Sequence, residues 1–130
     1  MKLNYALFDE LTAKAKASPR LRMNFDLRDS NDDESMRMLN ALEPGTAIPV
    51  HRHNDTSEDV VVLRGVVEEV LFDDSGVEVE RYRLVHGSDC VACHVPKGQY
   101  HTCLSLESGS VIIEFKNGKY DKEKTEDFLR

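Results

Sequence analysis

Residues 45–65 read GTAIPVHRHNDTSEDVVVLRG, and this stretch carries His51 and His53, two of the five histidines of the chain. In a β-strand, residues two apart point to the same face and lie about 7 Å apart along the chain, so both imidazoles can converge on one ion. Glu58 follows five residues after His53, at the start of the next expected strand, and can add a carboxylate oxygen. Two histidines on a strand are by themselves usually unremarkable, so the prediction of a metal site needs further support.

His101 lies far along the chain, directly after Pro96-Lys97-Gly98-Gln99-Tyr100, which is expected to form a rigid turn. In a barrel, such a turn can present a fourth ligand from the opposite wall. The two remaining histidines, His86 and His94, are most simply a loop residue and a strand-surface residue.

The rest of the chain predicts one small, mainly β domain with a short N-terminal helix. Residues 4–17 place Leu7, Phe8, Leu11 and Ala15 on one side of a helix, which Ser18-Pro19 ends because the residue before proline avoids helical backbone angles. The run Val60-Val61-Val62-Leu63 is typical of a strand buried on both faces. Short apolar runs separated by turn signals indicate a sandwich or barrel, with strands expected at 36–42, 46–53, 58–64, 66–72, 77–85, 90–96, 100–106 and 110–116.

The spacing of glycines and ligands resembles the two sequence motifs of the cupin superfamily. The pattern Gly45-x5-His51-x-His53-x4-Glu58-x6-Gly65 is similar to the first motif, and Pro96-x-Gly98-x2-His101 is similar to the core of the second. The resemblance implies a double-stranded β-helix, or jelly-roll barrel, and a metal held by His51, His53, Glu58 and His101. The second motif departs from the family pattern at Cys90, which replaces a glycine, and at Ser105, which replaces an asparagine.

A closer resemblance covers most of the chain and concerns the WbuC family of cupin-fold metalloproteins. It is carried by SPRLRMN at 18–24, RMLNALEPGT at 37–46, HRH at 51–53 and EFKNGKY at 114–120. The family is associated with bacterial O-antigen and surface-polysaccharide gene clusters. Its members usually have tryptophan where this chain has Tyr100, and a histidine soon after position 24 that is missing here.

We therefore expect a single cupin domain over residues 1–130. Residues 1–20 would form the helix and lead-in, residues 21–118 the barrel, and residues 119–130 a charged tail that is either a surface helix or frayed.

Composition narrows the class of partner. The formal net charge of −7 argues against nucleic acid, whose phosphates require clustered basic residues, and no apolar run approaches the ~20 residues of a membrane span. Three cysteines and the lack of an apolar leader at the N-terminus predict a cytoplasmic protein with reduced thiols. A small-molecule substrate, sugar-derived or a small acid, is the expected partner, and we expect a homodimer that covers exposed strand edges.

Several residues are candidates for the pocket around the metal. Cys103 and Ser105 share the strand face of His101, although packing alone is the commoner role of such residues. Arginines near a metal suit a substrate carboxylate or phosphate, and surface salt bridges are the alternative. Tyr100 is a candidate proton donor, with a core-facing ring as the alternative. The candidates for substrate binding, besides Cys103, are Arg20, Arg22, Asn24, Arg37 and Asn40, which match residues that recur in the WbuC family.

Three imidazoles and one carboxylate leave about two of six octahedral positions open, which is typical of a catalytic rather than a structural metal site. The predicted cofactor is one divalent transition metal ion, and the sequence leaves Mn, Fe, Ni and Zn open. The leading hypothesis is a metal-dependent isomerase-like or epimerase-like enzyme that acts on a sugar or nucleotide-sugar in surface polysaccharide metabolism. An iron-dependent dioxygenase and a non-catalytic binding or sensor protein are the alternatives.

Overall fold

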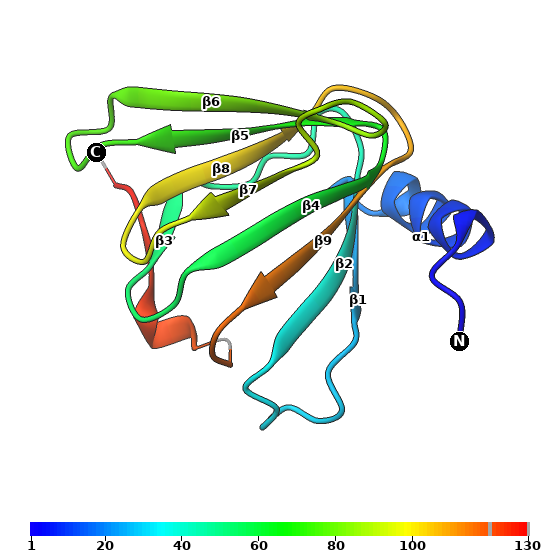
Figure 1. Ribbon diagram of the computed structural model, residues 1–130, viewed down its shortest axis with the longest axis horizontal. Coiled ribbons are helices and arrows are strands. Elements are labelled where there is room, and N and C mark those ends of the chain that lie inside the picture. The colour runs from blue at the N-terminus through cyan, green and yellow to red at the C-terminus, as the bar shows by residue number, and fades with distance from the viewer. Residues whose placement is uncertain (120, 130) are drawn as a thin grey trace.

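The computed structural model describes residues 1–119 and 121–129, so Tyr120, the last residue of the segment 114–120, and Arg130, the last residue of the expected tail, lie outside the described residues. Two five-stranded antiparallel sheets face each other, with one helix outside them (Figure 1). Sheet A has the order β1-β2-β9-β4-β7 and sheet B the order β10-β3-β8-β5-β6. The elements are α1 Tyr5–Ala17, β1 Arg22–Asp26, β2 Met36–Leu42, β3 His51–His53, β4 Glu58–Arg64, β5 Val66–Phe72, β6 Glu78–Val85, β7 Ala92–Val95, β8 Tyr100–Ser105, β9 Ser110–Lys116, the short 3-10 helix η1 Lys122–Lys124 and β10 Thr125–Asp127.

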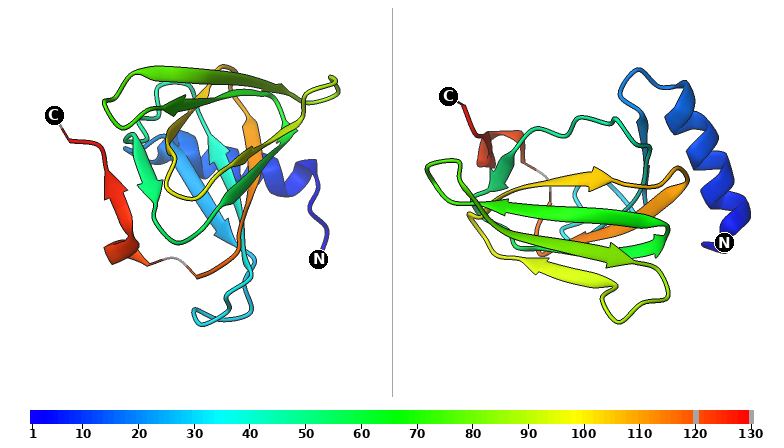
Figure 2. Two further views of the ribbon diagram at one scale, coloured as in Figure 1. Left: turned by 60° about the vertical axis from the view of Figure 1, so that its left-hand side comes forward. Right: turned by 90° about the horizontal axis from the view of Figure 1, so that it is seen from above.

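The helix α1 covers the outer face of sheet A. It begins after Asn4, whose side-chain oxygen accepts a hydrogen bond from the Leu7 backbone N–H at 3.1 Å. Its apolar side buries Phe8, Leu11 and Ala15 against the strands of sheet A. Figure 2 shows α1 and the C-terminal segment at opposite sides of the molecule. Within residues 1–119 and 121–129, no helix is long and apolar enough to cross a lipid bilayer.

Sheet A separates two apolar clusters because alternate residues of a strand point to opposite faces. Leu39 on β2 and Val111 on β9 pack against α1, whereas Ile112 faces the space between the sheets. On β4, Val60 and Val62 also face that space, while Val61 and Leu63 pack against the α1 cluster. The run Val60–Leu63 is therefore buried on its inner face and half-buried on its outer face.

Sheet B brings three segments that are distant in sequence side by side. Strand β8 pairs with β3, which places His101 opposite His51. On the other edge of β3, the C-terminal strand β10 places Thr125 opposite His53 and Asp127 opposite His51. The short β3 therefore lies between β8 and the end of the chain (Figure 2).

Gly65, the last glycine of the first motif, turns the chain from β4 into β5. Its φ is 87°, a left-handed conformation that side chains rarely adopt. A Cβ at this position would also lie 2.8 Å from the Cα of Ser110, closer than real Cβ atoms come. Both the conformation and the space therefore require glycine here.

The strands expected at 36–42, 58–64, 66–72 and 110–116 have the observed bounds. The strand expected at 46–53 is shortened to His51–His53, after Pro49, which has no backbone N–H to donate. Strands β1 and β10 are additional. Where the sequence suggested a surface helix or a frayed end after residue 118, the described part contains η1 and β10, which joins sheet B.

Candidate metal centre

The predicted ligands His51, His53 and His101 form a compact group on the inner face of sheet B. One ring nitrogen of each can be chosen so that all three lie within 4.8 Å of one another. The ring centroids of His51 and His101 are 4.3 Å apart, and that of His53 lies 5.0 Å from His51 and 5.5 Å from His101. The antiparallel pairing of β3 with β8 produces this proximity, because it sets His51 directly opposite His101.

Each of the three imidazoles is held through its Nδ1 atom. The Nδ1 of His51 lies 2.7 Å from the Pro49 carbonyl oxygen, and that of His101 lies 2.9 Å from the Gln99 carbonyl oxygen. The Nδ1 of His53 lies 3.1 Å from the Thr125 Oγ1. A carbonyl can only accept, so His51 and His101 carry a proton on Nδ1. Their Nε2 atoms then carry the lone pair in the neutral ring, which is the tautomer of a metal ligand held by an outer hydrogen bond.

Glu58 stands next to these nitrogens at the start of β4, in the facing sheet. One of its carboxylate oxygens lies 3.4 Å from the Nε2 of His53 and 3.3 Å from the Nε2 of His101, and the residue is only 5% exposed. Burial alone would raise the pKa of Glu58, but its contacts with His101 and His53 hold that pKa well below its usual range. The carboxylate is therefore ionised at neutral pH.

The pKa values of two histidines fit a ligand set that exchanges protons for a cation. Burial, together with the nearby His101, lowers the pKa of His51 to about 4, so this ring is neutral. Burial opposes the protonated form of His101, but its contact with Glu58 and the charge of that carboxylate raise the pKa to about 9. A ligating imidazole must be neutral, so metal binding would release the proton that His101 holds.

The buried nitrogens themselves test whether a metal fits. Among the described residues, the Nε2 atoms of His53 and His101 are buried and have no hydrogen-bond partner. A Glu58 oxygen lies 3.4 and 3.3 Å from these two nitrogens, and an unprotonated Nε2 that faces it has no donor to accept from, at a cost of about 1–3 kcal/mol. The three histidine nitrogens, with a Glu58 oxygen close to those of His53 and His101, fit a divalent transition metal ion.

Two further carboxylates, which the sequence analysis missed, lie in the same cavity. Glu69 on β5 is 1% exposed and forms a second group of potential metal donors with Glu58 and His101. Burial and the charge of Glu58 raise the pKa of Glu69 to about 8 and that of Glu114, on β9, to about 7. The sequence signal for these residues is a glutamate at an inward-facing position of an otherwise apolar strand. That signal places a glutamate beside the histidines only when the pairing register of the strands is known.

The cavity that contains these groups has a volume of about 390 Å³. It is lined by five of the residues that the sequence suggested for substrate binding, namely Arg20, Arg22, Asn24, Asn40 and Cys103. Ser105 does not line it, and its hydroxyl donates a hydrogen bond to the Glu107 carbonyl at 3.1 Å.

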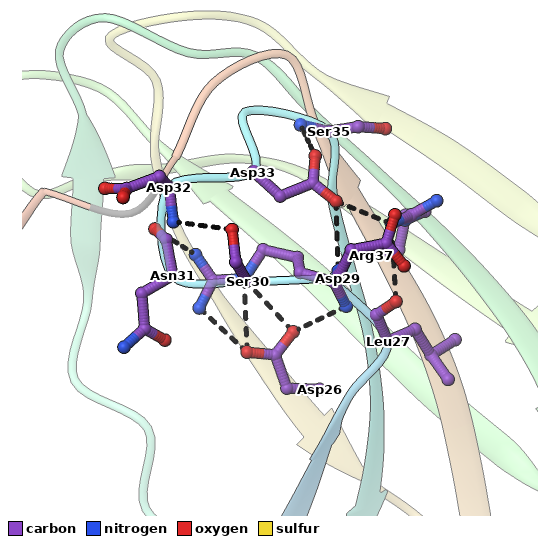
Figure 3. A network of polar contacts seen from close by, with 10 residues as sticks. Asp26, Leu27, Asp29, Ser30, Asn31, Asp32, Asp33, Ser35 and Arg37 are labelled. Atoms are coloured by element: carbon purple, nitrogen blue, oxygen red, sulfur yellow. Dashed lines mark hydrogen bonds and ion pairs between the residues drawn. The ribbon is translucent and has the colours of Figure 1, made fainter.

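Arg37 is not brought to the cavity. Its position on β2 points toward the loop between β1 and β2, where its guanidinium pairs with Asp33 at 2.8 Å and donates to the Leu27 carbonyl at 3.3 Å (Figure 3). The structural alternative, a salt bridge, describes Arg37 in this structure.

Tyr100 also lies away from the histidines. It immediately precedes His101 on β8, so its ring points to the opposite face of sheet B. There it packs against Phe128, with ring centroids 5.3 Å apart, and beneath the guanidinium of Arg52, 4.5 Å from the ring centroid. The ring is buried, at 6% exposure, but on the outer face of sheet B, so neither the proton-donor role nor the core-facing alternative describes Tyr100.

Comparison with protein families gives one match. A family model described as Domain of unknown function (DUF6016) matches residues 3–84, which is more than half of the chain. The chain belongs to this family. The matched part of this DUF6016 protein contains His51, His53 and Glu58, whereas His101 and the strands β7 to β10 lie beyond it. No curated protein matches the chain.

Solved structures show the cupin fold for the DUF6016 protein. CapF from Staphylococcus aureus, a capsular polysaccharide assembling protein, aligns with a TM-score of 0.72 and 19% identity over 87% of this chain. The alignment spans 33% of CapF, so this chain corresponds to about a third of that protein. An oxalate oxidase in complex with glycolate aligns with a TM-score of 0.65 and 16% identity, over 80% of this chain and 54% of its own. KdgF from Halomonas sp. aligns with a TM-score of 0.60 and 20% identity, over 82% and 86% of the two chains. These neighbours are cupins, and the predicted fold class is confirmed.

Proposed function

We propose that this DUF6016 protein is a metal-dependent cupin enzyme that acts on a sugar or nucleotide-sugar in surface polysaccharide metabolism, by isomerase-like or epimerase-like chemistry. The observation that carries the proposal is the orientation of the histidines. Pro49, Gln99 and Thr125 hold the three Nδ1 atoms, and the Nε2 atoms of His53 and His101 lie 3.4 and 3.3 Å from one Glu58 oxygen. In this proposal His51, His53, Glu58 and His101 are the ligands of one divalent transition metal ion.

The chemistry of such a site divides between the ion and the chain. A bound divalent metal would supply a Lewis acid that polarises a carbonyl or hydroxyl group of the substrate. The closed end of the barrel excludes water behind the site, since Val60, Val62 and Ile112 fill the space there. Glu69, buried beside His101, is placed to hold or accept a proton, because its raised pKa of about 8 lies near neutral pH.

Two likenesses support the sugar-derived class of substrate. The sequence resembles the WbuC family, which is associated with surface-polysaccharide gene clusters, and we propose that the chain is related to it. CapF, whose fold this chain shares, is a capsular polysaccharide assembling protein. Both likenesses point to the same area of metabolism.

We also propose that residues 1–130 act as a single cupin domain, in the cytoplasm, and as a homodimer. Val77 and Val79, which are 56% and 51% exposed beside and on the edge strand β6, support a second copy at that edge. Light scattering after size-exclusion chromatography would measure the mass directly, and a monomeric mass would contradict the dimer.

The first test is metal content. Protein purified without a histidine tag should contain about one equivalent of a transition metal by plasma mass spectrometry. The His51→Ala/His101→Ala variant should lose it. The His86→Ala/His94→Ala variant removes two exposed histidines outside the cavity and should keep it. Equal metal content in all three proteins would contradict the assigned ligands.

The second test is catalysis. Epimerisation or isomerisation through proton abstraction incorporates deuterium from heavy water into the sugar ring, which NMR detects at each carbon. Nucleotide-sugars should gain deuterium with the wild-type protein and fail to do so with the His51→Ala/His101→Ala variant. Oxygen consumption by the iron-loaded protein, without deuterium incorporation, would instead favour a dioxygenase.

A further inference from the structure

The arginines of this chain differ in how their charge is balanced. Arg28, Arg37, Arg52, Arg64 and Arg81 each lie beside a carboxylate, and Figure 3 shows Arg37 with its partner Asp33. Within residues 1–119 and 121–129, Arg20, Arg22 and the exposed Arg83 have no such partner, and of these three Arg20 and Arg22 line the cavity. Two unbalanced cations beside one cavity are unexpected in a chain of net charge −7, where carboxylates outnumber cations.

The strand β1 fixes which side chains face the cavity. Met23 and Phe25 pack against the α1 cluster on the outer face, so Arg22 and Asn24 must point inward. The guanidinium of Arg22 is held by neutral groups only, since its Nη1 donates to the Thr46 Oγ1 and to the Ala47 carbonyl, both at 3.2 Å. Partial burial and, second, the neighbouring charge of Arg20 lower the pKa of Arg22.

The backbone between the two arginines is strained. Leu21 has φ of 56°, and it is the one residue other than glycine with a positive φ among the described residues. A branched side chain rarely adopts this conformation, and such strain tends to occur where the surrounding structure fixes a functional geometry. Here the Arg20 carbonyl accepts a hydrogen bond from the Thr46 hydroxyl at 2.6 Å, and the Leu21 carbonyl accepts one from the Glu43 N–H at 2.9 Å. The strained turn is therefore held on both sides of Leu21.

Polar groups deeper in the cavity also lack partners. The Oδ1 of Asn40, a residue only 8% exposed, and the Oε2 of Glu69 are buried without a hydrogen-bond partner in the described part of the chain. Asn40 lies opposite Asn24 on the neighbouring strand, so these amides lie between the arginines and the interior of the cavity. A ligand with hydroxyl groups could donate hydrogen bonds to both oxygens.

We propose that the cavity binds a small molecule with an acidic oxyanion group, phosphate or carboxylate, which Arg20 and Arg22 hold at the β1 side while the hydroxyl-bearing remainder extends past Asn40 toward the histidines. This assignment deepens the proposed function, on which it rests, by naming an anionic class of substrate. Guanidinium groups suit both oxyanions because their N–H donors match two oxygens at once. The acidic residues of the cavity, Glu58, Glu69, Glu114 and Asp127, belong to β4, β5, β9 and β10, so none of them comes from β1, which carries Arg22.

The test is calorimetric titration of the full-length protein, with its metal content measured, with inorganic phosphate and separately with malonate at constant ionic strength. In the Arg20→Gln/Arg22→Gln variant we expect at least about tenfold weaker binding of one of the two anions, since charge-assisted hydrogen bonds are lost. The anion whose affinity falls in this variant shows whether the site prefers a phosphate or a carboxylate. The control Arg83→Gln/Lys97→Gln changes net charge equally at two exposed positions outside the cavity and should bind within twofold of wild type.

Two further variants keep the outcome clear. Arg22 also bonds to Thr46, so the single variant Arg20→Gln, which removes only an exposed side chain, checks that weaker binding is not a folding defect. The His51→Ala/His101→Ala variant should still bind the anion, even if it loses metal. Loss of anion binding only in the histidine variant would place the anion on the metal and overturn the arginine site, while the metal site would stand. Unchanged binding in both arginine variants, or no binding of either anion to wild type, would also overturn it.

Discussion

The two ends of the barrel interior are built from the same strands but carry opposite chemistry. On β4 the inward positions change from Glu58 to Val60, and on β9 from Glu114 to Ile112. On β5 they change from Glu69 to Val67. One step of two residues along each strand therefore separates a polar cavity from a dry core.

This difference separates stability from function. Each large aliphatic side chain at the closed end contributes about 1.5–3 kcal/mol by leaving water. The open end, which is the polar cavity, lowers the free energy of unfolding. Four of the five buried side-chain atoms without hydrogen-bond partners in the described residues line this cavity. These atoms are those of Asn40, His53, Glu69 and His101. The closed end thus supplies the stability that keeps an unfavourable polar cluster in place.

The largest expected effect comes from the closed end. Leu42→Ala removes a side chain with 0% exposure from the cluster between the sheets, and should lower the free energy of unfolding by about 2–5 kcal/mol. Urea denaturation measures this loss. The exposed residue Leu106 is the matched control, and Leu106→Ala should change stability by no more than about 0.5 kcal/mol. Metal content per folded molecule should be unchanged in both variants, and its loss in Leu42→Ala would contradict the separation of the two ends.

The next effect concerns Glu69 and depends on pH. Its pKa is raised from 4.5 to about 8 in the folded chain, so the unfolded chain releases this proton first as pH rises. The stability of the metal-free protein that depends on this group is therefore complete below pH 4.5 and is lost as pH rises toward about 8, with a limiting slope of about 1.4 kcal/mol for each pH unit. Glu69→Gln should flatten the stability profile over this window in chemical denaturation at several pH values.

Glu68 provides the control for that measurement. It is adjacent in sequence but points to the other face of β5, where it lies 3.4 Å from the Arg81 guanidinium. Glu68→Gln should leave the slope between pH 4.5 and 8 close to that of wild type. A steeper or unchanged slope in Glu69→Gln would show that Glu69 is ionised in the folded protein.

A smaller effect is expected at the C-terminal strand. Thr125→Val keeps the size of the side chain but removes the hydroxyl 3.1 Å from the His53 Nδ1. Loss of an outer partner of a metal ligand typically weakens metal binding by about 10- to 100-fold. Competition with a chelator of known affinity measures the change, and Thr125→Ser, which keeps the hydroxyl, should restore tight binding. Equal affinity in all three proteins would mean that β10 does not position His53.

The elements that the sequence predicted well are those with a clear local signal. Strands 36–42, 58–64, 66–72 and 110–116 combine alternating or continuous apolar residues with flanking glycine or proline turns. Strand β1 reads RMNFD, in which Met23 and Phe25 alternate with polar residues; this alternation fits a half-buried strand, but it spans only five residues and no strand was predicted there. Strand β10 has three residues, two of them acidic, and forms because β3 offers an edge.

The site could also be predicted only in part, because only some of its residues have a local sequence signal. The histidines and Glu58 follow a spacing that resembles a known motif, and the structure brings them together. Glu69 and Glu114 become neighbours of that group only through strand register, which no local pattern encodes. Tyr100 was suggested by its place beside His101, and Arg37 by the resemblance to the WbuC family. Strand parity turns Tyr100 to the outer face of sheet B, and Arg37 pairs with Asp33 outside the cavity.

The smallest expected effect compares a histidine outside the cavity with those inside. His94 on β7 lies 2.7 Å from an Asp59 carboxylate oxygen, but the two side chains are 60% and 58% exposed, so water and salt screen the pair. His94→Ala should therefore change the free energy of unfolding by less than about 0.5 kcal/mol and leave metal content unchanged. Thermal and urea unfolding at two salt concentrations measure the first quantity. A loss above 1.5 kcal/mol would show that an exposed histidine pair supports sheet A, and it would weaken the view that stability is concentrated at the apolar end.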